Sequence, residues 1–369
     1  MRLQRRHRVG PNSFGKSLNV DNFRTMAIRE LLFGSTALDR SQLFFRGALI
    51  GAAVAVSLAA TSLSLGQDAY TLPLVMGCAF SAVVYLTGKP DTRARGMLWA
   101  IAWMFLATLL GGLVSNWGWP QLPIVAVVGL IGGYVGVVGR RGALIGVLAM
   151  QVYTVFAGLP MTPTTALKFS AVLALGGLTY VAVVTVIRWL NRRSLGDPGL
   201  PQGSPVFQRL DLQHPFSTHF GRHAIRLSIA LVIATALSHW LDWPHAYWIP
   251  MTIVLVSRPD TAGMANRVTQ RILGTLIGVS ITMLLVALFG DGPVAVIFYV
   301  AFGIVLMQTF VIANYPISVI GTTTLIMTLM ILTGDPVVIT DVFRIIETLI
   351  GGALTITAAL LLWRAQNQA

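Results

Sequence analysis

The sequence predicts an all-α polytopic membrane protein with about twelve transmembrane helices, arranged as two parallel six-helix repeats. Three observations lead to this fold class: an apolar composition, long apolar segments with short gaps between them, and charges that alternate from gap to gap. The chain of 369 residues is 55% hydrophobic and only 11% charged, whereas about a quarter of the residues in soluble domains are charged. A soluble fold is therefore excluded.

Basic residues occupy every second gap between the apolar segments. All of the 26 Lys and Arg residues except Lys168 and Arg344 lie in these gaps or in the basic terminal regions. The gaps between them carry acids instead, namely Asp68, Asp242, Asp291, Asp335 and Asp341. Short cytoplasmic loops retain Lys and Arg, so we expect both termini in the cytoplasm. The net charge of +13 comes from Lys and Arg that would lie beside the anionic lipids of the inner leaflet. A nucleic acid partner is not needed to explain this charge.

The apolar segments match the length of a membrane span, which is about 20 residues. They are residues 43–65, 70–88, 96–115, 121–139, 142–158, 167–190, 225–241, 246–257, 270–289, 292–313, 315–333 and 342–363. The eighth segment is short and Pro250 interrupts it, so protein or a water-filled cavity must cover it. Twelve spans is the expected count, and ten or eleven is the alternative.

Four domains follow from these segments. Residues 1–42 form a basic cytoplasmic arm, in which residues 22–33 have the pattern of an interfacial amphipathic helix. The first repeat covers 43–190 and the second covers 222–365, and a Pro- and Gly-rich cytoplasmic linker, 191–221, joins them. Residues 10–17 fit the Walker A pattern, but the preceding residues are too basic for the buried strand that a phosphate loop requires. We therefore expect no nucleotide.

The two repeats are predicted from motifs that recur in the same order. The pairs are 69–73 and 246–250, 89–92 and 258–261, 107–111 and 274–278, and the Gly-Gly steps at 176–177 and 351–352. An even number of spans per repeat gives both repeats the same orientation in the membrane. Internally duplicated bundles are typical of transporters, which bind their substrate between the repeats near the midplane.

The most informative motif residues lie between Pro244 and Gly278. They are Tyr247-Trp248-Ile249-Pro250, Arg258-Pro259-Asp260, Arg267, Arg271 and Gly274-Thr275. In order and spacing this segment resembles the fusaric-acid-resistance-like family, which includes the aromatic acid exporters. The resemblance implies a proton-motive-force-linked exporter of organic anions, often aromatic carboxylates, in a bacterial inner membrane. It implies no cofactor, and it suggests a periplasmic adaptor and a homo-oligomer as partners. The chain lacks the long cytosolic domain of larger exporters, and its first repeat has no counterparts of Arg267 and Arg271.

Arg258, Arg267 and Arg271 are candidate substrate-binding residues at the inner mouth of the eighth and ninth spans. Guanidinium groups bind carboxylates through two hydrogen bonds, so a cationic vestibule would gather an anionic substrate. The alternative is that these are loop charges that set the topology, with Asp260 as a local ion-pair partner. Asp260 is also a candidate for proton coupling.

Glu347 is the one acid placed clearly within a span, one helical turn after Arg344. Ionisable groups inside a membrane are costly and are usually paired or functional. One interpretation makes Glu347 the carrier of a coupling proton, with Lys168 and Arg344 as basic groups that meet the anion near the outer ends of the two repeats. The other makes Arg344 and Glu347 a structural ion pair, with Lys168 extending outward to the interface.

The remaining candidates serve stacking and packing. Tyr247 and Trp248 are candidates to stack on an aromatic substrate, whereas Pro250, Gly274, Thr275 and Gly278 are assigned to helix packing. No metal-binding or catalytic constellation is present in the sequence, so we expect no metal and no enzyme activity. The predicted function is secondary transport of an organic anion. The alternatives are a passive anion channel, since a plant malate-channel family is distantly similar, and a membrane assembly protein that transports nothing.

Overall fold

The computed structural model describes residues 40–87, 92–191, 218–258, 261–332 and 337–363. The predicted interfacial helix, the Walker A-like residues, Asp260 and most of the linker lie outside these ranges. Twelve α-helices make up most of the described chain, joined by turns and three short 3₁₀ helices. They are α3 (Phe45–Ser64), α4 (Asp68–Tyr85), α5 (Arg93–Val114), α6 (Leu122–Tyr134), α7 (Arg140–Ala157), α8 (Pro163–Asn191), α9 (His219–Leu241), α10 (Trp248–Val256), α11 (Thr261–Phe289), α12 (Pro293–Phe310), α13 (Tyr315–Ile331) and α14 (Val337–Trp363).

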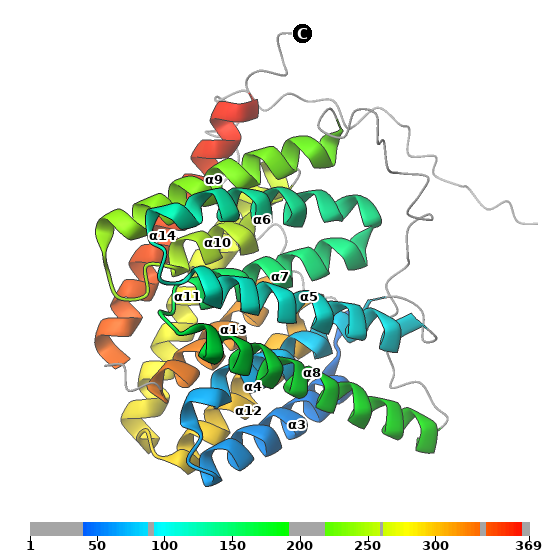
Figure 1. Ribbon diagram of the computed structural model, residues 1–369. Coiled ribbons are helices and arrows are strands. Elements are labelled where there is room, and N and C mark those ends of the chain that lie inside the picture. Colours follow the sequence, from blue (N-terminus) through cyan, green and yellow to red (C-terminus); the bar gives the residue numbers. More distant parts are fainter. Residues whose placement is uncertain (1–39, 88–91, 192–217, 259–260, 333–336, 364–369) are drawn as a thin grey trace, which may run out of the picture. The chain divides into compact units, whose positions relative to one another are not determined.

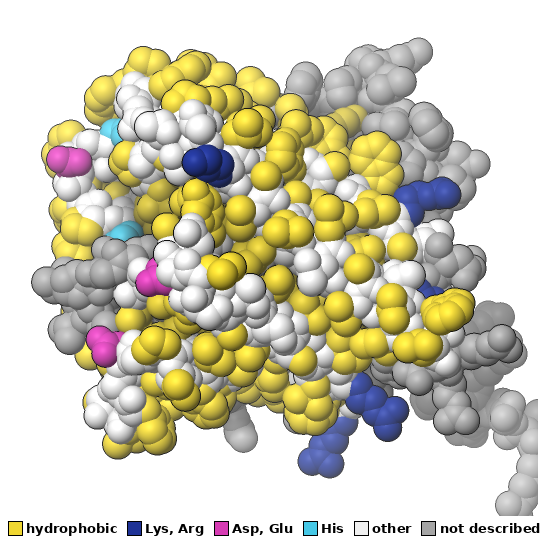
Figure 2. All heavy atoms as spheres, turned by 60° about the horizontal axis from the view of Figure 1, so that its bottom comes forward, with side chains coloured by type: hydrophobic (Ala, Val, Ile, Leu, Met, Phe, Trp, Pro, Cys, Tyr) yellow, Lys and Arg dark blue, Asp and Glu magenta, His cyan; other side chains and the backbone are white. Residues whose placement is uncertain are grey.

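The predicted all-α membrane class is confirmed over the described residues, which contain no strand element. Each of the twelve apolar segments coincides with one helix (Figure 1). Among the described residues, nine helices are long and apolar enough to cross a membrane, and α13 is a shorter apolar helix of 17 residues. Leu, Val, Ile and Trp side chains cover much of the outer surface, as lipid-facing helices require (Figure 2).

Charged side chains separate along the helix direction. In Figure 2 the visible acidic side chains lie at one end of the helices, and most of the visible Lys and Arg lie toward the other end. In the sequence, basic and acidic gaps alternate between the apolar segments, and in the structure the corresponding side chains gather at opposite ends of the helices (Figure 2). It is the arrangement that a multi-pass protein with basic cytoplasmic loops would have.

Helix α10 is short because it lies inside the bundle. It has nine residues, and eight of them are buried. Pro250 was expected to interrupt this segment, but α10 begins at Trp248, which places the proline in the first helical turn. A proline there removes no helical hydrogen bond, because the first N–H groups of a helix have no partner within it. Protein covers the helix on all sides, which satisfies the condition for a short segment at membrane depth.

The packing of the two halves follows one scheme. In the first half α4 packs on α3 and α8, α5 packs on α7 and α8, and α6 packs on α7. In the second half α10 packs on α9 and α14, α11 packs on α13 and α14, and α12 packs on α13. Between the halves, α6 lies beside α9 and α12 lies beside α3 (Figure 1). In both contacts the fourth helix of one half lies beside the first helix of the other half.

The recurring glycines occupy corresponding places in this scheme. A Cβ added at Gly111 would lie 2.7 Å from the carbonyl oxygen of Tyr153, and one added at Gly278 would lie 3.0 Å from that of Ile320. Both contacts join the third helix of a half to its fifth helix. The number of residues between Tyr153 and Ile320 equals the number between Gly111 and Gly278.

The Gly-Gly steps behave in the same way. A Cβ at Gly177 would lie 2.7 Å from Ile101 of α5, and one at Gly352 would lie 2.8 Å from Val268 of α11. Ile101 and Val268 are separated by the interval that separates Gly111 from Gly278. These contacts support the predicted duplication and align the two halves residue by residue.

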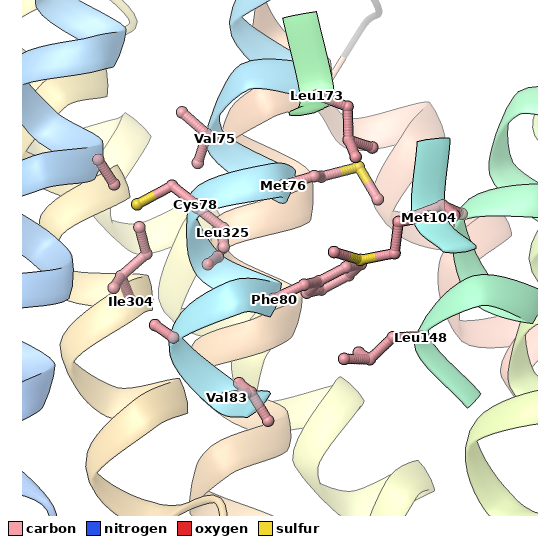
Figure 3. Packing of buried hydrophobic residues seen from close by; sticks show 14 of the residues in the cluster. Val75, Met76, Cys78, Phe80, Val83, Met104, Leu148, Leu173, Ile304 and Leu325 are labelled. Carbon is pink, nitrogen blue, oxygen red and sulfur yellow. The ribbon is translucent and has the colours of Figure 1, made fainter. Parts of the chain in front are cut away.

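The hydrophobic core is centred on α4. Its side chains Val75, Met76, Cys78, Phe80 and Val83 point in several directions and meet the neighbouring helices (Figure 3). Those neighbours contribute Leu173, Met104, Leu148, Ile304 and Leu325. The single cysteine is fully buried here, as a small core residue would be.

Candidate functional site

The candidate site begins at the start of α10. Tyr247 and Trp248 are 7% and 1% exposed, so both aromatic side chains are buried between helices. His245 stacks on Trp248 with ring centroids 4.8 Å apart and an interplanar angle of 15°. His245 has a φ of 62°, a conformation that non-glycine residues adopt rarely. The turn before α10 therefore holds three aromatic rings in a fixed group.

Arg344 of α14 lies against this aromatic group. Its guanidinium carbon is 4.7 Å from the centroid of the Trp248 ring, within the range of a cation–π interaction. The Arg344 side chain is completely buried, and within the described part of the chain none of its three guanidinium nitrogens has a hydrogen-bond partner. Glu347, one turn later, is also completely buried, and neither of its carboxylate oxygens has a partner among the described residues. The structure thus shows no hydrogen bond between Arg344 and Glu347, which the interpretation of a structural ion pair would require.

Arg271 of α11 completes the charged cluster. It is 1% exposed, and its Nε and Nη2 atoms have no hydrogen-bond partner. Arg344 lies close enough to Arg271 and to Glu347 for charge interactions with both. We call Arg271, Arg344 and Glu347 the charged cluster. It holds two positive charges against one negative charge when the carboxylate is ionised.

The charged cluster lies deep in the bundle. Arg271 is ten residues from the start of α11, and Glu347 is ten residues from the start of α14, which is about 15 Å along each helix. The alternation of basic and acidic gaps predicts that the two helices enter the membrane from opposite sides. All three residues lie within the candidate spans Gly263–Phe289 and Val342–Leu361. Arg271 is thus deeper than the inner mouth, and Arg344 is farther from the outer end than the sequence suggested.

The other two arginines of the predicted vestibule lie nearer the surface, although the charge of Arg267 still acts on Arg271. Arg267 is half-buried, and its guanidinium carbon lies 3.3 Å from the centroid of the Tyr315 ring. Arg258 is exposed, and its backbone carbonyl accepts a hydrogen bond from Nη2 of Arg226. The three arginines therefore form a series from the surface to the interior. Only Arg258 has the exposure of a loop charge that sets the topology.

Lys168 and Arg344 do not form an equivalent pair. Lys168 is exposed on α8, whereas Arg344 is buried. Exposure of Lys168 fits a side chain that extends outward to the membrane interface. The structure thus places Arg344 beside Arg271 and leaves Lys168 apart from the charged cluster.

A small cavity lies between the two halves next to Trp248. Its walls come from α4, α7, α10, α12 and α13, and they are mostly apolar. Four methionines and three aromatic residues line it together with Gln151 and Thr322: Met76, Met251, Met307, Met330, Phe80, Tyr247 and Trp248. The cavity volume is about 20 Å³, which is enough for about one water molecule. Trp248 separates this cavity from the charged cluster and contributes to both.

The charged cluster has no polar counterpart in the first half. The alignment of the halves pairs Arg271 with Met104 and Arg344 with Phe169. Phe169 packs edge-on against Tyr70, the counterpart of Tyr247, with ring centroids 5.5 Å apart. The first half thus has the aromatic ring of Phe169 at the position where the second half has the cation of Arg344. At the position that corresponds to Arg271, the first half has the buried Met104.

The packing residues lie where helices meet closely. A Cβ at Gly274 would lie 2.6 Å from Cβ of Val319 and 2.8 Å from the carbonyl oxygen of Pro316. Thr275 is 1% exposed and its hydroxyl has no hydrogen-bond partner. Among the described residues, no group of three or more His, Cys, Asp or Glu is placed to hold a metal ion. The sequence contained no signal that Arg271 and Arg344 would meet, because they lie on helices separated by two others.

Comparison with known proteins shows what the second half is similar to. Residues 232–358 match the fusaric acid resistance protein-like family, which confirms the resemblance found in the sequence. An uncharacterized protein of Synechocystis is 26% identical over 166 residues, 43% of this chain and 21% of that protein. An uncharacterized protein of Neisseria gonorrhoeae is 33% identical over 142 residues, 38% of this chain and 34% of the relative.

The inner membrane protein YccS of Escherichia coli is 28% identical over 164 residues, 44% of this chain and 23% of YccS. The matched region thus spans about a fifth to a third of the length of these relatives. No solved structure matches the chain. The similarity to YccS and the many apolar helices support a multi-pass location in the inner membrane.

Proposed function

We propose that this membrane protein of the transporter type, with a fusaric acid resistance protein-like second half, is a secondary transporter. It exports organic anions of the aromatic carboxylate kind across the bacterial inner membrane, linked to the proton motive force. Both termini face the cytoplasm in this proposal, as the basic gaps suggest. A periplasmic adaptor and a second copy of the chain are its proposed protein partners.

The observation that carries this proposal is the charged cluster. Arg271 and Arg344 are buried within candidate membrane spans with five guanidinium nitrogens that lack a partner among the described residues. Leaving a charged group buried without a partner costs several kcal/mol. Buried ionisable residues in membrane proteins therefore mark a functional pathway by default. An anion with acceptor oxygens would satisfy these donors, and a carboxylate has the geometry that the guanidinium fork binds best.

The surroundings of the cluster favour an anion that carries an aromatic ring. Trp248 forms a wall shared by the charged cluster and the methionine-lined cavity. Methionine side chains adapt their shape and contact aromatic rings favourably. The cavity is too small for such a substrate in the present arrangement, so its helices must move apart to admit one. This requirement is consistent with alternating access between repeats.

A passive anion channel is the alternative supported by the same charged cluster. A channel needs a continuous path for the anion, whereas the cavity beside Trp248 is closed to about the size of one water molecule. The closed cavity thus favours a transporter. A membrane assembly protein that transports nothing is a further alternative, and it would tolerate replacement of Arg271 and Arg344.

The test is uptake of labelled p-hydroxybenzoate into inside-out vesicles, with and without an imposed pH gradient. We expect gradient-dependent accumulation by the wild type and its loss in Arg271→Ala. The matched control is Arg258→Ala, which removes an exposed arginine and should retain transport. Equilibration that ignores the gradient would identify a channel. Wild-type flux in Arg271→Ala, at equal amounts of protein in the membrane, would contradict the role of the charged cluster.

A further inference from the structure

The charged cluster has an electrical balance that restricts which anions it can hold. Arginine side chains stay protonated in proteins, and Glu347 is the one acid whose described side chain lies with Arg271 and Arg344. Arg267 also acts on the charge of Arg271, but it is half-buried and lies over the Tyr315 ring, so its charge is partly balanced outside the cluster. Counting only the completely buried groups, the net charge is +1 with Glu347 ionised and +2 with Glu347 protonated. A buried site is most stable when its bound anion neutralises it, because uncompensated charge is costly at low dielectric constant.

From this balance we infer that Glu347 determines the charge of the anion that the site accepts. A monoanion neutralises the cluster when Glu347 is ionised, and a dianion neutralises it when Glu347 is protonated. The dianion complex therefore holds one more proton than the monoanion complex. The inference rests on the proposed function, because it takes Arg271 and Arg344 as the anion site, and it adds a residue that selects the substrate by charge.

The geometry leaves Glu347 free to change its protonation state. Neither of its oxygens has a hydrogen-bond partner, and no ion pair joins it to Arg344. A carboxylate held in an ion pair would stay ionised, because a nearby cation favours the charged form. The charge of Arg344 acts on Glu347, but no hydrogen bond joins the two side chains. It can thus gain a proton when a second negative charge enters, without breaking a bond.

The described ionisable side chains of the helices packed against α14 include no second acid. Arg344 is the charge that acts on Glu347, and Arg271 and Tyr247 act on Arg344 in turn. Helix α10 contains no ionisable side chain. The ionisable groups on the other helices packed against α14 are His219, Arg222, His223, Arg226 and His239 on α9, Arg267 and Arg271 on α11, and Tyr315 on α13. The histidines can also take up a proton near neutral pH, so the Glu347→Gln variant is needed to assign the proton to Glu347.

The experiment measures proton uptake on binding of two anions that share one ring, benzoate with one carboxylate and terephthalate with two. Both are fully ionised between about pH 6 and about pH 8. Titration calorimetry of the purified full-length protein, in buffers with different ionisation enthalpies, gives the number of protons bound with each anion. For the wild type we expect terephthalate to bind with about one proton more than benzoate. The terephthalate affinity relative to that of benzoate should then rise by up to about tenfold per pH unit on acidification.

In Glu347→Gln the difference in bound protons should disappear, and terephthalate should bind more tightly than it does to the wild type at about pH 8. The matched control is Asp242→Asn, the same chemical change at an exposed acid, which should retain the wild-type difference. Equal proton uptake for the two anions in the wild type would overturn the inference, and this measurement needs no variant to fold. A wild-type protein that binds neither anion would instead overturn the proposed function, and the inference with it.

Discussion

Replacement of Arg344 by methionine tests whether the charged cluster is a functional site or a structural ion pair. The two interpretations predict opposite signs for the change in the free energy of unfolding. Removing one partner of a buried ion pair destabilises a protein by about 3–5 kcal/mol, because the other charge is left uncompensated. Replacing a whole buried ion pair by apolar side chains of similar volume is often neutral or stabilising, by about 1–4 kcal/mol, and a buried charge without a partner likewise has no pairing energy to lose.

The structure predicts the stabilising outcome. Arg344 is completely buried, its three guanidinium nitrogens have no partner, and no ion pair joins it to Glu347. The substitution also removes the contact with Trp248, which is worth about 0.5–2 kcal/mol. The balance leaves Arg344→Met about as stable as the wild type or more stable by about 1–2 kcal/mol, while binding of organic anions is lost.

The assay is thermal unfolding of the detergent-purified protein, followed by anion binding to the same sample. Arg258→Met is the control, since a substitution at an exposed position changes stability by about 0.5 kcal/mol or less. The double variant of Arg344→Met with Glu347→Gln should show little coupling energy. A loss of about 3 kcal/mol in Arg344→Met, recovered in the double variant, would refute the reasoning and establish a structural pair.

Three further predictions concern other parts of the chain. Gly274→Leu should lower the yield of folded protein, because its side chain would meet the backbone of Pro316 at about 2.8 Å, and overpacking costs about 1–3 kcal/mol. Gly292→Leu, at a position with no neighbour within 4 Å, should be extracted at the wild-type yield; equal yields of both would argue against close packing. Trp248→Leu should weaken binding of p-hydroxybenzoate by up to about tenfold, as loss of an aromatic contact would, and leave binding of hexanoate unchanged; an equal loss for both anions would exclude stacking. Lys16→Ala should leave transport unchanged in the vesicle assay, and a clear loss would reopen the question of nucleotide binding.

The residues of the charged cluster could be recognised one at a time from the sequence. Arg271 was identified as a motif residue at the inner mouth of the ninth span, and Glu347 as an acid within a span, where ionisable residues are costly. Their arrangement could not be predicted, since Arg271 and Arg344 were expected near opposite faces of the membrane. Arg271 is the eleventh of the 29 residues of α11 and Arg344 the eighth of the 27 residues of α14, but which faces of the two helices meet depends on the packing of the other helices.

Positions that depend on local chain chemistry were predicted well, and positions that depend on distant contacts were not. The twelve apolar segments each became a helix because a span must satisfy its backbone hydrogen bonds internally, a property of the segment itself. Pro250 was expected to break a helix, and only the observed start of α10 at Trp248 shows that it occupies a harmless position. Lys168 and Arg344 had similar sequence contexts, yet one is exposed and the other is buried.

The sequence by itself determined the membrane class, the number of helices and the duplication signal. Hydropathy, segment length and the order of charges are read along the chain and need no knowledge of neighbours. Only the tertiary structure decided that Arg271, Arg344 and Glu347 share one buried space without pairing, and that the first half fills the equivalent space with Met104 and Phe169. The physical reason is that burial and the absence of partners are properties of several helices at once.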